Sequence, residues 1–368
     1  MSLAAPPKAL VTGCAGFIGS HVVEHLLAEG FQVHGIDSFD DYYDPRLKVE
    51  NIETALHHEN FELQVIDLAD VDAVRDLAAR TRPDVIIHLA GMPGVRRSID
   101  EPARYVRSNI VATQNILDTF SREGAVPIVF AGTSSAYGND TPVPFDEGAA
   151  CIAPPSPYAA TKRACELLCS VAHDTFAAPI TIVRLFTVYG PRQRPDLAIR
   201  KFAMSMLHRK EITIFGDGSM ARDFTHVSDI VRGIAAAAKE RAGFRIVNLG
   251  NSSPVSVLEL VEKLGKALGV VPRLRFVPRP PGEMNVTFAN TTRAAERWGW
   301  KPRVSLEEGL ADFARWARSR PHGADQRVCV GKSGIPCGLW RSEFCALDRT
   351  AHEPKTCALE NDLAALSV

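Results

Sequence analysis

A tyrosine and a lysine stand four positions apart in a segment that opens with Ser156 and Pro157. Serine is a preferred N-cap and proline is favoured at the first helical position, so the segment predicts a helix. The spacing places Tyr158 and Lys162 on one face of that helix. Because a nearby cation stabilises phenolate, the pKa of Tyr158 could fall from about 10 toward neutrality and make it a general base for a hydroxyl group. The alternative is a solvated helical pair without a chemical role.

Hydroxyl groups follow a buried strand expected at residues 128–131, in the run Gly132-Thr133-Ser134-Ser135-Ala136-Tyr137-Gly138. Doubly wound sheets bind ligands at the carboxyl ends of their strands, so this run is expected to face a ligand. Thr133 could hydrogen-bond the reacting hydroxyl group. The alternative, that these hydroxyls only satisfy backbone groups of the turn, fits Ser135 better than Thr133.

Three glycines join the strand expected at Ala9–Thr12 to a following helix, in the run Gly13-Cys14-Ala15-Gly16-Phe17-Ile18-Gly19. Gly13 permits a tight turn, Gly16 lets the backbone approach a diphosphate, and Gly19 lets the helix pack close to the strand. The diphosphate would lie at the helix N-terminus. A strand, turn and helix in this order predict a dinucleotide site.

Asp37 ends the second expected strand, where a carboxylate would accept hydrogen bonds from the adenosine ribose. Ser38 and Phe39 follow it, and no adjacent arginine is available to hold a 2′-phosphate. The sequence therefore favours NAD over NADP. The alternative is an aspartate that only caps the strand.

Two further strand ends extend the predicted cofactor site. Asp67 and Leu68 follow the third strand, where a pair facing adenine would lie, and Leu89 and Ala90 follow the fourth, beside the expected diphosphate and nicotinamide ribose. Either pair could equally be ordinary strand-end chemistry. The residues predicted to contact NAD are Gly13, Gly16, Phe17, Ile18, Gly19, Asp37, Asp67, Leu68, Leu89, Ala90, Asn109, Tyr158 and Lys162.

Composition excludes several classes of function. Of 368 residues, 46% are hydrophobic and 23% charged, as in ordinary globular proteins. Lys plus Arg (42) nearly equals Asp plus Glu (43), so no net field would recruit nucleic acid or an anionic membrane. No apolar run approaches the roughly 20 residues that span a bilayer, and a cytoplasmic location is expected. The eight cysteines show no CxxC pair, which argues against a metal site or a redox dithiol.

The first part of the chain alternates short apolar runs with helical periods up to about residue 190. This alternation predicts an α/β fold with a Rossmann-like, doubly wound parallel sheet. Strands are expected at Ala9–Thr12, Gln32–Ile36, Glu62–Ile66, Val85–Leu89, Ile128–Ala131 and Thr181–Leu185. Helices between them are expected at His21–Glu29, Val71–Ala79 and Ile110–Phe120.

A smaller C-terminal substrate-binding domain is expected beyond that sheet. Its predicted elements are helices at Ala198–Leu207, Asp229–Lys239 and Val257–Leu268, a strand at Ile212–Phe215, and a closing helix at Ser305–Ala317. The predicted division is therefore 1–186 and 187–320, with part of 223–250 packing back on the first domain. The tail at 321–368 carries four cysteines and no sustained period, and is expected to be poorly ordered.

The sequence resembles the extended short-chain dehydrogenase/reductase family. The resemblance is carried by the glycine run at 12–19, by Tyr158 and Lys162, and by the run Arg-Asp-Phe-Thr-His-Val-x-Asp at 222–229, and it covers residues 8 to about 318. Within the family the chain is most similar to the UDP-glucuronate 4-epimerases. The residues that favour this subgroup are Asp40-Asp41-Tyr42-Tyr43-Asp44, His88-Leu89-Ala90, Phe186-Thr187-Val188-Tyr189-Gly190-Pro191 and Arg194-Pro195-Asp196.

The resemblance implies a UDP-sugar substrate, a catalytic trio of Thr133, Tyr158 and Lys162, and NAD that stays bound through turnover. It implies substrate contacts at Thr187, Arg222, which would lie near the diphosphate, and Glu283. The full predicted set is Ser134, Ser135, Thr187, Arg192, Arg194, Phe215, Arg222 and Glu283. Two departures stand out: Glu283 replaces a more usual aspartate, and Leu-Ala-Gly-Met-Pro-Gly at 89–94 replaces a more usual Ala-Ala-x-Ala-Gly run.

The expected reaction is oxidation at C4, rotation of the bound 4-keto sugar and re-reduction on the opposite face. Dehydrating relatives carry an acid and a base directly after the threonine, where this chain has Ser134 and Ser135. Decarboxylating relatives carry a glutamate at the position of Ser135. Arg192 and Arg194 could bind the uronate carboxylate, and the alternative is two solvated surface arginines.

Other readings stay open. A UDP-glucose/UDP-galactose 4-epimerase would need the same trio without a carboxylate anchor. A UDP-glucuronate decarboxylase, a dehydrogenase that releases NADH and a non-catalytic, NAD-sensing protein are further alternatives. A homodimer through helices at Ile110–Phe120 and Tyr158–Phe176 is expected by analogy with the family.

Overall fold

A computed structural model describes residues 5–122, 126–279 and 285–319. Its largest sheet has seven parallel strands in the order β10-β6-β5-β4-β1-β2-β3. The strands are β1 (Lys8–Thr12), β2 (Gln32–Asp37), β3 (Phe61–Val65), β4 (Val85–His88), β5 (Ile128–Thr133), β6 (Ile180–Leu185) and β10 (Phe244–Leu249). The predicted Rossmann-like α/β class is confirmed.

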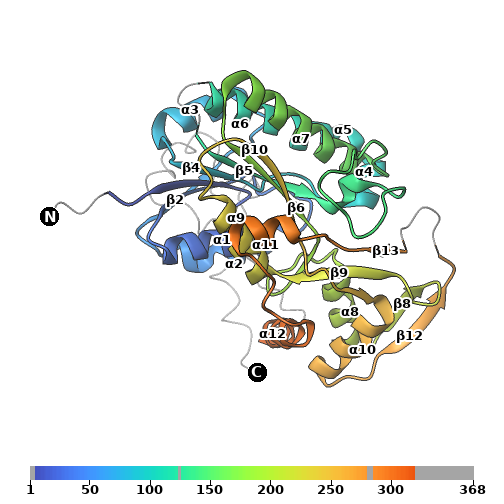
Figure 1. Ribbon diagram of the computed structural model, residues 1–368. Coiled ribbons are helices and arrows are strands. Elements are labelled where there is room, and N and C mark those ends of the chain that lie inside the picture. The colour runs from blue at the N-terminus through green and yellow to red at the C-terminus, as the bar shows by residue number, and fades with distance from the viewer. Residues whose placement is uncertain (1–4, 123–125, 280–284, 320–368) are drawn as a thin grey trace, which may run out of the picture. The chain divides into compact units, whose positions relative to one another are not determined.

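Helices cover both faces of this sheet (Figure 1). On one face lie α3 (Val71–Thr81), α6 (Ala112–Ser121) and α7 (Pro157–Phe176), which contact one another in sequence, and on the other lie α1 (Phe17–Ala28), α2 (Pro45–Leu56) and α9 (Val227–Ala237). Apolar side chains of α3, α6 and α7 share one buried core with the strands. Because both faces are covered, β4 and β5 are buried along their whole length, as parallel strands require.

Short elements connect and edge this layer. They are α4 (Val95–Asp100), α5 (Pro102–Tyr105), the π-helix η1 (Val106–Val111), the 3₁₀ helix η2 (Ser134–Tyr137) and α11 (Thr292–Trp298). The predicted helix at Ile110–Phe120 therefore begins in the π-helix η1 and continues as the α-helix α6. The predicted helices at Ala198–Leu207 and Val257–Leu268 are confirmed at both ends, and other predicted boundaries shift by at most four residues. The largest shift is at α1, which begins at Phe17 rather than His21.

A second core lies around α8 (Ala198–Leu207), α10 (Val257–Leu268) and α12 (Leu306–Ser319). Three strands pair with the central strand β9 (Ala221–His226): β7 (Thr187–Tyr189), β11 (Pro254–Ser256) and β13 (Val286–Thr287). Two more, β8 (Glu211–Phe215) and β12 (Arg273–Val277), form a parallel pair.

The chain crosses between the two cores more than once. After β9 it returns to the large sheet, where α9 packs on α1 and β10 adds the seventh strand beside β6. The division at residue 186 stays a prediction. The tail at 321–368 lies outside the described residues.

Candidate active site

The glycine run forms a tight turn from β1 into α1. Gly13 has φ +70°, and a Cβ there would lie 2.8 Å from the backbone N of Ala90. A Cβ on Gly19 would lie 2.0 Å from the carbonyl oxygen of Gly13, so only glycine allows the helix this close to the strand. No side chain caps the N-terminus of α1 at Gly16. The backbone N–H groups of this first turn therefore suit an anion such as a diphosphate.

Asp37 lies at the carboxyl end of β2 and organises the turn around it. Its carboxylate accepts hydrogen bonds from the backbone N–H of Phe39 (2.8 Å) and of Ala15 (3.3 Å). Lys48 on α2 donates to the same carboxylate at 3.1 Å, and both side chains are buried. Since a carboxylate offers about four acceptor sites, Asp37 can still accept from a ribose hydroxyl.

Sequence reasoning missed Lys48. The buried residues of α2 are Lys48, Asn51, Ile52 and Ala55, which recur at helical spacing. A lysine on the apolar face of a helix needs a partner, and that periodicity was the available signal.

The segment after β4 is held by a chain of hydrogen bonds through His88. The backbone N–H of Ala90 donates to the Thr12 hydroxyl (3.2 Å), which lies 2.7 Å from His88 Nδ1. The other ring nitrogen, Nε2, lies 3.1 Å from the Thr113 hydroxyl. Burial, with a smaller effect of Lys162, lowers the pKa of His88 to about 3, so the ring is neutral. Leu89 and Ala90 are thereby fixed beside Gly13.

Asn109 lies in the π-helix, and such helices are frequent at functional sites. Its side chain accepts from the backbone N–H of Met92 (2.7 Å) and donates to the Thr161 hydroxyl (3.0 Å). Asn109 therefore ties the segment after β4 to α7. Of the predicted adenine-facing pair, Leu68 packs in the core and Asp67 binds Arg107 at 2.5 Å.

The predicted catalytic trio comes together at the carboxyl end of β5. Ser156 caps α7 by accepting from the N–H of Ala159 (3.2 Å), and Pro157 follows it, as expected. Thr133, the last residue of β5, accepts from the N–H of Ser135 (3.1 Å) and hydrogen-bonds the Tyr158 side chain.

Lys162 is buried one turn further along α7. Its Nζ lies 4.3 Å from the centre of the Phe130 ring, a cation–π contact. A Cβ on Gly91 would lie 3.7 Å from the same nitrogen. Lys162 is thus packed between β5 and the segment after β4.

The electrostatics of Tyr158 differ from the expectation. Burial raises the pKa of Tyr158 above its ordinary value, opposed by the Thr133 hydrogen bond and the charge of Arg194. Burial also lowers the pKa of Lys162. The prediction that Lys162 lowers the Tyr158 pKa is therefore not confirmed by the protein's own groups, because Lys162 rests on Phe130 and desolvation dominates.

The two predicted carboxylate-binding arginines have different surroundings. Arg192 donates to Glu24 on α1 at 2.6 Å. Arg194 forms a two-point ion pair with Asp196, at 3.0 and 2.9 Å, and only 18% of its side chain is exposed. Neither is a solvated surface arginine. Each therefore has a carboxylate partner already, and what distinguishes Arg194 is that its charge acts on the Tyr158 side chain.

The remaining predicted substrate contacts lie on several elements. Ser134 and Ser135 are in η2, Thr187 begins β7, and Arg222 lies on β9, where its guanidinium donates to the carbonyl of Ala221 at 2.9 Å. The Phe215 ring, at the end of β8, lies 5.3 Å from the Arg96 guanidinium of α4. Glu283 lies outside the described residues.

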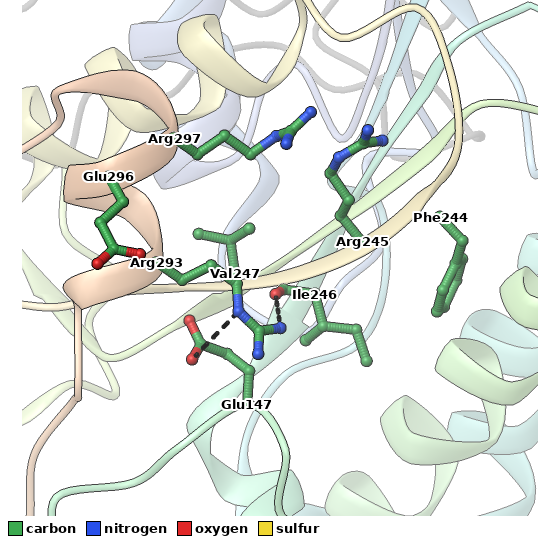
Figure 2. Close-up of a pocket in the computed structure, with 8 residues that line it drawn as sticks. All are labelled: Glu147, Phe244, Arg245, Ile246, Val247, Arg293, Glu296 and Arg297. Carbon is green, nitrogen blue, oxygen red and sulfur yellow. Dashed lines mark hydrogen bonds and ion pairs between the residues drawn. The ribbon is translucent and has the colours of Figure 1, made fainter.

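A separate hollow of about 510 Å³ lies along the outer edge of β10 and α11 (Figure 2). Three arginines line it, and Glu147 and Glu240 lie within ion-pair distance of them, with Glu240 shared by Arg245 and Arg297. Arg293 lies 3.8 Å from Glu147 and donates to the carbonyl of Ile246, while Arg297 binds Glu240 at 2.6 Å. No predicted site residue lines this hollow.

Two searches of the described residues gave negative results. In residues 5–122, 126–279 and 285–319, no group of three His, Cys, Asp or Glu side chains could hold a metal ion. Over the same ranges no helix is long and apolar enough to cross a membrane.

Known proteins are similar to this chain in sequence and fold. A UDP-glucuronate 4-epimerase of Thermodesulfobacterium geofontis is 40% identical over 310 residues, which cover 84% of this chain and 95% of that protein. The crystal structure of the UDP-glucuronic acid 4-epimerase of Bacillus cereus with UDP-glucuronic acid and NAD is 38% identical, covers 85% of this chain and 99% of its own, and has a TM-score of 0.79.

An epimerase with a different substrate is also similar to this chain. The UDP-glucose 4-epimerase of Thermotoga maritima is 31% identical over 85% of this chain and 99% of its own, with a TM-score of 0.77. The model of the NAD dependent epimerase/dehydratase family matches residues 9–250, which include the glycine run, Asp37 and the trio. The predicted cofactor, NAD, is confirmed at the level of the family. On this match and these relatives, the chain belongs to the NAD dependent epimerase/dehydratase family.

Proposed function

We propose that the protein is a 4-epimerase that interconverts UDP-glucuronate and UDP-galacturonate. The observation that carries the substrate assignment is Arg194, a largely buried guanidinium whose charge acts on the Tyr158 side chain. A cation near the general base suits a sugar that carries a carboxylate beside the reacting carbon. Relatives of that specificity, at about the same identity in a bacterium and in Arabidopsis thaliana, support the assignment.

The residues of the cofactor side fit NAD. Gly13 and Gly19 clear the space that a Cβ would fill, and the uncapped N-terminus of α1 suits the diphosphate. Asp37 remains available to the ribose. When bound, NAD supplies an acceptor for the hydride of C4 and a donor that returns it, so no net redox change results.

The chain's own side chains transfer the proton and bind the substrate. Tyr158 removes the proton of the 4-hydroxyl and returns it after the 4-keto sugar has turned over, with Thr133 holding the hydroxyl in reach. The pKa of Tyr158 starts above its ordinary value, so a positive nicotinamide ring would complement Thr133 and Arg194 in stabilising phenolate. Arg222 would hold the diphosphate while the sugar moves.

The neighbouring reactions have less support. Ser134 and Ser135 in η2 offer no acid–base pair for dehydration. The absence of a carboxylate at Ser135 also disfavours decarboxylation. A UDP-glucose/UDP-galactose 4-epimerase is the second candidate, because the Thermotoga maritima structure shares the fold at 31% identity. That reaction gives Arg194 no carboxylate to bind and leaves it only its effect on the pKa of Tyr158.

The test is product identification from purified protein. UDP-glucuronate with a little NAD should yield UDP-galacturonate, followed by NMR, without CO2 and without free NADH. UDP-glucose run in parallel should yield little UDP-galactose. Tyr158→Phe keeps the ring but removes the acid–base group, and should lower kcat by about 10²–10⁴-fold.

Other products would exclude this function. UDP-xylose or a 4-keto pentose would make the protein a decarboxylase, and turnover of UDP-glucose alone would support the second candidate. Accumulation of NADH would indicate a dehydrogenase. NAD binding without any turnover would indicate a sensing protein.

The proposal includes a homodimer in the cytoplasm. The helix α7 exposes Leu167 (53%) and Val171 (59%), which lie four residues apart on one face. Apolar side chains at this spacing suit helix-to-helix packing with a second copy. Sedimentation of the purified protein distinguishes a dimer from a monomer.

A further inference from the structure

Tyr42 lies in the loop after β2, yet its side chain reaches the loop that carries Arg194. The hydroxyl donates to the Asp196 carboxylate at 3.2 Å across 154 residues of sequence. The ring is flanked by two guanidiniums, with Arg97 at 4.9 Å and Arg194 at 5.8 Å from its centre. Tyr42 therefore contacts Arg194 directly through its ring and indirectly through Asp196.

Asp196 holds one edge of the Arg194 guanidinium. Nε donates to one carboxylate oxygen at 3.0 Å and Nη2 to the other at 2.9 Å, which leaves Nη1 outside this pair. Such a two-point pair fixes both position and orientation. It also compensates the arginine charge, which weakens the attraction of Arg194 for any second carboxylate.

The Tyr42 hydroxyl donates to the same Asp196 oxygen that Nη2 binds. A donor on that oxygen draws negative charge away from Arg194. The guanidinium then keeps more of its positive field for a second anion, while its orientation stays fixed. This division of the Asp196 charge is the physical basis for a role of Tyr42.

The loop of Tyr42 is held rigidly from the opposite side. The Tyr42 N–H donates to Asp40 (2.8 Å), and Arg104 on α5 binds Asp40 at 2.8 Å and also pairs with Asp41. Arg97 on α4 donates to the Tyr42 carbonyl at 2.9 Å. The tyrosine is thus fixed before any ligand arrives.

The space around the hydroxyl depends on Gly94. A Cβ at Gly94, whose φ is +98°, would lie 2.2 Å from the Tyr42 hydroxyl oxygen. Gly94 belongs to the Leu-Ala-Gly-Met-Pro-Gly run that departs from the more usual family sequence. Tyr105, whose hydroxyl donates to the Pro93 carbonyl at 2.6 Å, stands edge-on to Tyr158 at 6.3 Å between ring centres. Tyr42 therefore lies against the segment that Tyr105 binds, and Tyr105 in turn contacts the Tyr158 ring.

We propose that Tyr42 is a positioning residue that sets Arg194, through Asp196, to bind the carboxylate of a uronic acid sugar. This inference rests on the proposed function, because it assigns the preference for a uronate over a neutral hexose to the Tyr42–Asp196–Arg194 contact. Tyr42 touches neither the reacting carbon nor the cofactor in this assignment. It acts only through Arg194.

The test compares Tyr42→Phe with a matched neighbour, Tyr43→Phe. The Tyr43 hydroxyl is buried and has no hydrogen-bond partner among the described residues, so its loss breaks no contact of this kind. For NAD-loaded wild type and both variants, calorimetry gives the Kd of UDP-glucuronate and of UDP-glucose, and kinetics give KM and kcat. Thermal unfolding checks that each variant is folded.

Tyr42→Phe should weaken UDP-glucuronate binding about tenfold, a change of about 1.4 kcal/mol, and raise its KM with little change in kcat. Binding of UDP-glucose should stay unchanged, and Tyr43→Phe should behave as wild type. Asp196→Asn uncovers the Arg194 charge but loses the two-point pair that orients the guanidinium, and because the loss of orientation dominates it should also weaken UDP-glucuronate binding. The double variant should show less than the sum of the two single effects, because both act on one contact.

Two results would overturn the inference while the proposed function stands. One is a wild-type Kd for UDP-glucuronate in Tyr42→Phe. The other is an equal loss for UDP-glucuronate and UDP-glucose, which would make Tyr42 a general structural residue. If the wild-type protein does not convert UDP-glucuronate, the proposed function fails first, and the role of Tyr42 falls with it.

Discussion

The glycine run at residues 13–19 is shaped by backbone atoms, whereas the loop at residues 190–196 is held by charged side chains. On the first side, a Cβ on Gly19 would meet the Gly13 carbonyl at 2.0 Å. On the second, Arg192 reaches Glu24 across 168 residues and Asp196 meets Tyr42 across 154. The Gly13–Gly19 turn of the cofactor side is therefore encoded locally, whereas the loop at residues 190–196 on the substrate side depends on segments that only the fold brings together.

The ion pairs of the cofactor side and of the substrate side also differ in how exposed their side chains are. The Lys48–Asp37 pair has side chains 9% and 6% exposed, while the Arg192–Glu24 pair has 18% and 32%. Charges deeper in the protein interact more strongly and cost more when left alone. Four experiments, from the largest expected effect to the smallest, test this contrast.

Removing one partner of each ion pair should give unequal losses of stability. Lys48→Met leaves the Asp37 carboxylate buried and uncompensated, and should lower the free energy of unfolding by about 3–5 kcal/mol. Arg192→Met, the control on the substrate side, should cost about 1 kcal/mol or less. Urea unfolding of both variants gives the two values. Equal costs would remove the contrast in burial.

Adding one carbon to the glycine run should lower both the stability of the fold and the affinity for NAD. Gly19→Ala places a Cβ against backbone that cannot yield, and should cost about 1–3 kcal/mol and weaken NAD binding. Gly30→Ala is the control, because its Cβ meets no atom within 4 Å and its only strain comes from a φ of +83°. Fluorescence titration with NAD should show a loss for Gly19→Ala alone. Normal NAD affinity there would show that the turn tolerates rearrangement.

A conservative change on the substrate side should affect affinity rather than stability. Arg194→Lys cannot reproduce the two-point pair with Asp196, so the KM for UDP-glucuronate should rise about tenfold. Arg192→Lys is the matched control and should leave that KM within about twofold. Tm should stay near the wild-type value in both. A large fall in Tm for Arg194→Lys would mean that the pair stabilises the fold instead of tuning the site.

Acid should lower the free energy of unfolding through His88, which holds the segment after β4. Its pKa is lowered to about 3 by burial, so below pH 6.5 the unfolded chain binds a proton that the folded protein does not. The contribution is fully present above pH 6.5 and is lost as the pH falls toward 3. Between pH 7 and pH 6 this amounts to about 0.7 kcal/mol. His88→Gln should show a correspondingly shallower pH dependence in urea unfolding, and an unchanged slope would contradict the neutral, buried ring.

Much of the fold and part of the site followed from the sequence. Apolar runs that alternate with helical periods predicted the parallel sheet, and Ser156 and Pro157 predicted the start of α7. The strand β10 was absent from the predicted strands, because Phe244–Leu249 reads as an ordinary apolar run until β6 lies beside it. Helix boundaries before α6 were wrong, since a π-helix has no simple apolar period.

What the sequence by itself determined is the set of local rules: where glycine is required, where a helix is capped, and which residues of one helix share a face. Each depends on residues within a few positions of one another. Only the tertiary structure decided that Lys48 meets Asp37, that Tyr42 meets Asp196, and that burial raises rather than lowers the pKa of Tyr158. Partners and desolvation arise from packing between distant segments, and spacing along the chain contains no direct record of either.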